Sequence, residues 1–99
     1  MLTVIREVGI LPGKTAAARS LLVELTALAR ETTGAEFEAV RPVGGNPQRQ
    51  GWCTRYKDLA AYDAAWAKLM AEPRFAQLMQ KTPDLFVPGS MNEVIWQSI

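Results

Sequence analysis

The sequence of 99 residues contains no histidine and only one cysteine, Cys53. Histidine is the commonest general base and a frequent ligand of metals and haem, so we expect no metal or haem cofactor. A single cysteine excludes an intrachain disulfide and fits a reducing compartment. Because no histidine can activate its thiol, Cys53 is not expected to act as a nucleophile.

The chain also lacks an excess of either charge and any long apolar run. Eleven basic side chains face ten acidic ones, for a formal net charge of +1. No field of one sign is therefore available to hold a nucleic acid or an anionic membrane. No segment approaches the ~18 apolar residues of a membrane span, and residues 1–6 lack the features of a secretion signal. We therefore expect a cytoplasmic protein that binds neither nucleic acid nor membrane.

Alternating and helical patterns of apolar residues divide the rest of the chain. Alternation with β-branched residues predicts strands, and apolar residues three and four apart predict amphipathic helices. Thr15 and Asp58 are suitable helix caps, and Gly34 and Pro73 are helix-ending signals. The predicted strands are 1–10, 36–43, 50–57 and 91–99; the predicted helices are 15–34 and 58–71, with a further helical segment after Pro73 and a loop at 82–90.

The order of these elements is βαββαβ, the split βαβ arrangement. With right-handed crossovers it gives one domain, residues 1–99, of the ferredoxin-like α+β class. We expect a four-stranded antiparallel sheet with both helices on one face and the first and third strands at its centre. The length of the chain is enough for one core but leaves a small domain that gains stability by oligomerising.

The face of the sheet away from the helices is predicted to carry apolar side chains too. In the first strand, Ile5 points away from Leu2 and Val4, and in the last strand Val94 and Trp96 point away from Ile95. Each such aliphatic side chain stabilises the fold by ~2 kcal/mol when fully buried. Since the helices cover one face only, a second copy of the sheet is the simplest cover, and we expect a homodimer.

Three short segments resemble the NIPSNAP family. They are Val4-Ile5-Arg6-Glu7-Val8 running into Leu11-Pro12-Gly13-Lys14, Thr54-Arg55-Tyr56, and Glu72-Pro73-Arg74-Phe75. The resemblance implies a dimeric α+β barrel, the group that includes cofactor-free antibiotic-biosynthesis monooxygenases and haem-degrading enzymes. It also implies that any ligand cavity lies between the sheet and the helices of one subunit. Val8 and Thr54 stand where the family favours tyrosine and tryptophan, and the helical histidine of the enzyme branches is missing.

The candidate ligand contacts on the strands are Arg6, Trp52, Thr54 and Tyr56. Arg6 lies in the middle of a central strand, where a guanidinium needs a partner. It is either an anchor for a ligand oxygen or one half of a structural ion pair, with Asp58 or a residue across the dimer as its partner. The other three residues share one strand face, where they either contact a ligand or pack in the core.

Two further candidates lie on the second helix. Tyr62 and Trp66 are four residues apart, so their rings share one helical face, which should point at the sheet. They would form the lid of a cavity, although core packing would require the same positions. The site therefore has six candidate contacts: Arg6, Trp52, Thr54, Tyr56, Tyr62 and Trp66.

Three functions fit these residues. The first is binding of a small hydrophobic or aromatic ligand in a cleft between sheet and helices. The second is a cofactor-independent monooxygenase acting on quinols or polyketide-like phenols, with Arg6 stabilising the substrate anion. The third is a homodimeric interaction module without enzymatic activity, which the absence of a strong catalytic constellation favours. The volume of the cleft distinguishes the third from the others, because aromatic side chains that fill it leave no room for a ligand.

Overall fold

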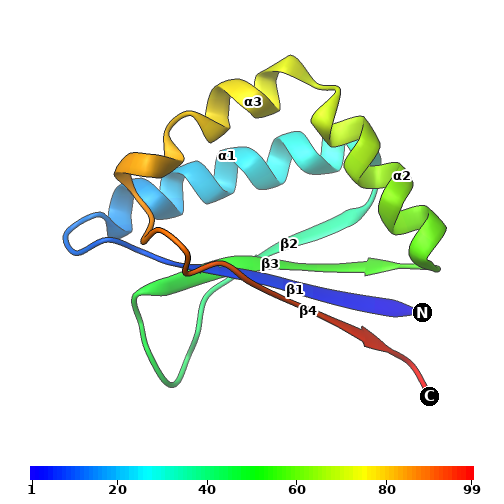
Figure 1. Cartoon of the computed structure of the whole chain (residues 1–99), viewed down its shortest axis with the longest axis horizontal. Coiled ribbons are helices and arrows are strands. Elements are labelled where there is room, and N and C mark those ends of the chain that lie inside the picture. Colours follow the sequence, from blue (N-terminus) through cyan, green and yellow to red (C-terminus); the bar gives the residue numbers. More distant parts are fainter.

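The computed structural model describes residues 1–99 and has the predicted order of elements (Figure 1). The further helical segment expected after Pro73 is helix α3. The elements are β1 (Leu2–Gly9), α1 (Thr15–Thr33), β2 (Glu36–Val40), β3 (Arg49–Tyr56), α2 (Leu59–Met70), α3 (Pro73–Met79), the 3-10 helix η1 (Thr82–Asp84) and β4 (Asn92–Gln97).

The four strands form one antiparallel sheet in the order β2-β3-β1-β4. The ferredoxin-like α+β fold is therefore confirmed, with β1 and β3 at the centre. Arg6 on β1 lies directly opposite Trp52 on β3 and Glu93 on β4. Side chains directly opposite each other share a face, so this register places all three on the same side of the sheet.

All three helices lie on that side (Figure 1). Leucines of α1 meet Leu69 of α2, Phe75 of α3, and Phe37 and Trp52 of the sheet in one core cluster. Leu69 is fully buried. The cluster fixes the helices over the sheet, and no helix is long and apolar enough to cross a membrane.

The ends of several elements differ from the predictions. Lys14, not Thr15, is the N-cap of α1, and no side chain caps that helix. Strand β2 ends at Val40 rather than at residue 43, because Pro42 has no N–H to continue the ladder. The predicted cap of α2 is confirmed, since Asp58 Oδ1 accepts from the N–H of Ala61 at 2.9 Å. The residues before and after Glu72 belong to separate helices, as Pro73 predicted.

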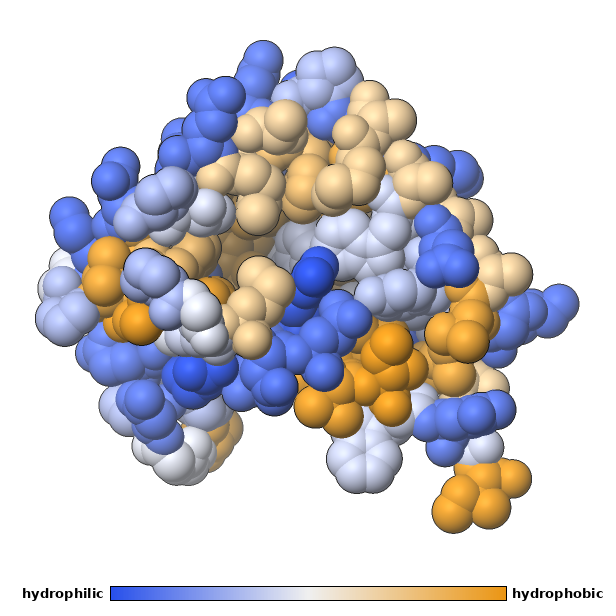
Figure 2. Space-filling model, in the orientation of Figure 1, coloured by the Kyte–Doolittle hydropathy of each residue, from blue (hydrophilic) through white to orange (hydrophobic).

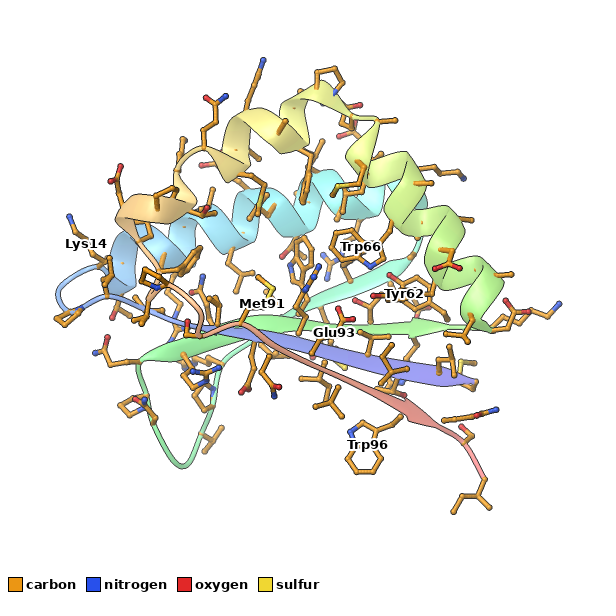
Figure 3. All side chains as sticks on the ribbon, viewed as in Figure 1. Lys14, Tyr62, Trp66, Met91, Glu93 and Trp96 are labelled. Carbon is orange, nitrogen blue, oxygen red and sulfur yellow. The ribbon has the colours of Figure 1, made fainter.

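The face of the sheet away from the helices carries a mixed surface. Ile5 and Cys53 lie opposite each other at its centre, next to Val94. Trp96 projects from this face, away from the helices, and is 64% exposed (Figure 3). Charged residues surround the apolar positions, with Glu36 opposite Arg55 and Glu38 opposite Cys53. The expected apolar side chains are therefore present, but they form a central strip rather than a whole apolar face.

Candidate functional site

A cavity of about 670 Å³ lies on the helix side of the sheet. Twenty residues line it, twelve of them hydrophobic, from β1, β3, all three α-helices and the segment between α3 and β4. Figure 2 shows the hollow with apolar surface above it and hydrophilic surface below it. Its volume is in the range of small-molecule sites, which are mostly apolar with few polar groups.

Four of the six predicted contacts line this cavity: Arg6, Trp52, Tyr62 and Trp66. Thr54 and Tyr56 do not line it, although both are buried on the same face of the sheet. Tyr56 packs with Leu2, Val4 and Ala65 in a separate cluster, and its ring centroid is 5.4 Å from that of Tyr62. This cluster fills the space beside β3 that the cavity would otherwise occupy.

Arg6 is held by Glu93 on one side and by an aromatic ring on another. Its Nε lies 3.3 Å from Glu93 Oε2, and its guanidinium carbon lies 4.5 Å from the centre of the Trp66 ring. The structural partner of Arg6 is thus Glu93 rather than Asp58. Nε is buried and makes an ionic contact with Glu93 without a hydrogen bond, and no hydrogen bond engages the two Nη groups either. The Nη end of Arg6 is therefore the part that can donate to a molecule in the cavity.

Glu93 is a further candidate site residue, which the sequence alone did not reveal. Its Oε1 accepts a hydrogen bond of 2.8 Å from the Tyr62 hydroxyl, and its Oε2 faces Arg6. The three side chains come from α2, β4 and β1, and Figure 3 shows Glu93 and Tyr62 together between α2 and the sheet. The only charged side chain of β4 was the available signal, but its partner depends on the register between β4 and β1.

This network changes the acidity of Tyr62. Burial is the largest cause, the hydrogen bond to Glu93 adds to it, and together they raise the pKa of Tyr62 to about 12. Burial also raises the pKa of Tyr56. Both effects favour the neutral phenol. Tyr62 therefore stays protonated at neutral pH, where its hydroxyl donates a hydrogen bond to Glu93. It is not an acid that could protonate a ligand.

We expect Tyr62 of the folded protein to stay protonated at pH 10. Because the folded pKa of Tyr62 exceeds its ordinary value, its contribution to stability is complete below about pH 10. That contribution is lost as the pH rises toward 12. A spectrophotometric titration tests this, since Tyr56 and Tyr62 are the only tyrosines. Tyr56→Phe isolates the Tyr62 step, and ionisation of that variant near pH 10 while it is still folded would contradict the expectation.

The remaining polar groups of the cavity wall are engaged within the protein. Trp52 Nε1 donates to Thr26 Oγ1 at 2.8 Å, so Trp52 offers the cavity its ring alone. The amide of Gln50 donates to the Ala18 carbonyl and accepts from Arg19. Glu7, the other charged residue of the wall, pairs with Arg49 at 3.2 Å. The cavity thus combines aromatic surface with very few free polar atoms.

One side of the cavity is formed by the strap, residues 82–91, which the sequence predicted only as a loop. Thr82, Pro83, Phe86, Val87, Pro88, Gly89 and Met91 line the wall. Backbone hydrogen bonds join the strap to the end of β1, from Leu11 to Leu85 and from Val87 to Gly9. Together with Met70 and Met79, Met91 gives the wall three flexible thioether side chains, which adapt to differently shaped ligands.

The structure contains no group of three or more His, Cys, Asp or Glu side chains placed to hold a metal ion. Cys53 lies on the other face of the sheet, away from the cavity. The chemistry available at the site is therefore apolar contact, aromatic stacking and hydrogen bonding from one guanidinium.

No protein-family model matches the chain, and no curated protein matches it by sequence. Solved structures share its fold. An uncharacterised NIPSNAP domain protein from Burkholderia xenovorans superposes with a TM-score of 0.84 at 15% identity, covering 100% of this chain and 95% of the other. A candidate antibiotic biosynthesis monooxygenase from Nitrosomonas europaea gives 0.75 at 15% identity, with 100% and 99% covered. A second one, from Deinococcus radiodurans, gives 0.74 at 15% identity, with 100% and 93% covered. These structures confirm the ferredoxin-like α+β fold of the single chain that the resemblance to NIPSNAP proteins implies.

Proposed function

We propose that this protein binds a small, hydrophobic, aromatic ligand in the cavity between its sheet and its helices. The observation that carries the proposal is the combination of an apolar cavity of about 670 Å³ with one guanidinium whose Nη groups have no protein partner. Trp52 and Trp66 would stack against the ligand, and Arg6 would donate to one of its oxygen atoms. Thr54 and Tyr56 would support the site from behind rather than touch the ligand.

The size of the cavity also separates this proposal from a pure interaction module. An interaction module requires the aromatic side chains to fill the space between sheet and helices. Tyr62 and Trp66 instead border a cavity whose volume is well above ~300 Å³, the lower end of the range for small-molecule sites. Protein interiors are normally close-packed, so an apolar cavity of this size favours a ligand over a filled core.

The neutral fluorescent probe N-phenyl-naphthylamine tests the proposal. We expect saturable binding, with an increase in emission as the probe leaves water for the cavity. Val8→Phe should weaken binding at least about tenfold, because Val8 lines the cavity and the larger ring occupies it. Val23→Phe is the matched control, since Val23 is 65% exposed on α1 outside the cavity. Equal binding by the two variants, or no saturable binding by the wild type, contradicts the proposal.

A second candidate is a cofactor-independent monooxygenase. It is supported by the free Nη groups of Arg6, which could donate to a substrate oxyanion, and by the shared fold with candidate antibiotic biosynthesis monooxygenases. The substrate would supply the electrons, one oxygen atom would enter it, and the other would leave as water. Oxygen uptake with a quinol should then exceed that of buffer for the wild type and fall for Arg6→Ala. Equal rates for wild type, variant and buffer exclude this candidate.

We also propose that the protein is a homodimer joined through the open sheet face. The central strip of Ile5, Cys53, Val94 and Trp96 is the apolar surface that a second copy would cover. Charges of both signs border it, with Glu36 and Arg55 side by side, so a twofold axis can place each beside its opposite on the partner. The two copies would leave both cavities accessible, because the cavity lies on the helix side.

Sedimentation at micromolar concentration should therefore give the mass of a dimer. Val94→Lys places a charge within the strip and should convert the protein to a folded monomer, since a buried, unpaired ammonium opposes association. Val23→Lys, on the outer surface of α1, is the matched control and should stay dimeric. A compact monomer for the wild type rules out this part of the proposal.

A further inference from the structure

We infer that Glu93 makes the cavity select neutral carbonyl ligands over carboxylates, by neutralising Arg6 while leaving its Nη groups free to donate. The inference rests on the proposed function, because it concerns the ligand of the same cavity. It assigns a chemical class to that ligand, namely an uncharged aromatic molecule with an accepting oxygen, such as a ketone, quinone or ester. It also assigns Glu93 a role in specificity although Glu93 itself does not line the cavity.

The charge of Arg6 is balanced within the protein. A lone arginine in an apolar site attracts carboxylates. Here Glu93 Oε2 lies 3.3 Å from Arg6 Nε, so the pair carries no net charge. An incoming carboxylate would meet the fixed Glu93 carboxylate as well as the guanidinium, and it would also lose its hydration. The attraction of Arg6 for a full negative charge is therefore largely cancelled.

The free donors of Arg6 are its two Nη groups. Nε is buried against Glu93, so the guanidinium presents its Nη groups to the cavity. Stacking on Trp66, at 4.5 Å, fixes the guanidinium in this orientation. A neutral carbonyl oxygen can accept from these groups without displacing the Glu93 carboxylate. The hydrogen bond is still charge-assisted, because the donor is a cation.

The other polar side chains around the cavity already have partners within the protein. The Tyr62 hydroxyl donates to Glu93, and Trp52 and Gln50 are engaged with α1. A ligand with several hydroxyl groups would find few partners for them and would lose their hydration on entry. The cavity is thus suited to one accepting oxygen on an apolar aromatic body.

Three naphthalenes substituted at the same ring position test the inference: methyl naphthyl ketone, naphthoate and ethylnaphthalene. Their affinities are measured at neutral pH by displacement of N-phenyl-naphthylamine from the cavity. The wild type should bind the ketone at least about tenfold more tightly than naphthoate. Glu93→Gln keeps an oxygen that accepts from Tyr62 but removes the charge. The affinity of this variant for naphthoate should be at least about tenfold higher than that of the wild type. Its affinities for the ketone and the hydrocarbon should change less than about threefold.

Glu24→Gln is the matched control, because Glu24 is an exposed carboxylate of α1 outside the cavity and its loss changes the net charge equally. It should leave all three affinities unchanged. Naphthoate binding to the wild type as tightly as the ketone overturns the inference, as does a Glu93→Gln variant with unaltered preference. If Glu93→Gln does not fold, the comparison of ketone and naphthoate in the wild type still decides. Absence of any probe binding instead overturns the proposed function.

Discussion

Replacing Gly51 with alanine should destabilise the protein by at least about 3 kcal/mol, the largest effect we expect of any single methyl group added to this chain. Gly51 lies in the central strand β3, opposite Glu7. A Cβ at this position would lie 2.8 Å from the Glu7 Cα and closer still to the Arg6 carbonyl oxygen. Both are backbone atoms, so the clash can be relieved only by moving β1 away from β3.

Thermal unfolding followed by circular dichroism measures this loss. In a domain of this size each kcal/mol lowers the melting temperature by roughly 4–8 °C, so a decrease of at least about 12 °C is expected. Gly44→Ala is the matched control, because a Cβ there meets no atom within 4 Å and its φ is not positive. Its melting temperature should change by only a few degrees. A Gly51→Ala variant as stable as this control would show that the two strands are not as close as described.

The same substitution bears on the site. Arg6 and Glu7, the backbone neighbours of Gly51, both line the cavity, and Gly51 lines it as well. Displacing β1 would move Arg6 relative to Trp66 and Glu93, which come from other elements. Any Gly51→Ala protein that does fold should therefore also bind the cavity probe more weakly than Gly44→Ala. Such a result would show that the close approach of β1 and β3 sets the position of Arg6 in the cavity.

Leu69→Ala should cost about 3–4 kcal/mol of unfolding free energy. Leu69 is fully buried in the cluster that joins α1, α2, α3 and the sheet. Truncating it removes apolar contacts and leaves a void that close-packed neighbours fill only in part. Urea denaturation at equilibrium gives the change directly, as a lower midpoint with an unchanged slope.

Leu59→Ala provides the control for Leu69→Ala. It is the same chemical change in the same helix, but Leu59 is 59% exposed. We expect its effect to stay within about 0.5 kcal/mol. Helix α2 also carries Tyr62 and Trp66, so the loosened packing at position 69 should weaken probe binding as well. Equal stability losses for the two variants would contradict the description of α2 as anchored by Leu69.

Much of the fold follows from local sequence patterns. Alternation over residues 1–10 and the leucines of residues 21–28 correspond to β1 and α1, because these periods match the geometry of strand and helix. Asp58 and Pro73 mark helix starts through hydrogen bonding and backbone restriction that act within a few residues. The shortening of β2 also has a local cause in Pro42, which the alternation of apolar residues alone did not reveal.

The candidate site was predictable only in part. Arg6 was identified because a cation in the middle of a central strand needs a partner, and Tyr62 and Trp66 because their spacing places both rings on one helical face. All three line the cavity. Thr54 and Tyr56 lie on the same strand face as Trp52 but outside the cavity, since a period of two gives the face of a residue and not what packs against it.

By itself, the sequence determined the order of the elements, the face on which each strand residue lies, and the absence of imidazole and disulfide chemistry. Each of these depends on residue type or on spacing within one segment. The tertiary structure alone decided that Glu93 is the partner of Arg6, that the strap lines the cavity, and that the aromatic rings leave about 670 Å³ between them. These features depend on the register and distance between segments far apart in the chain, which packing of the whole domain sets.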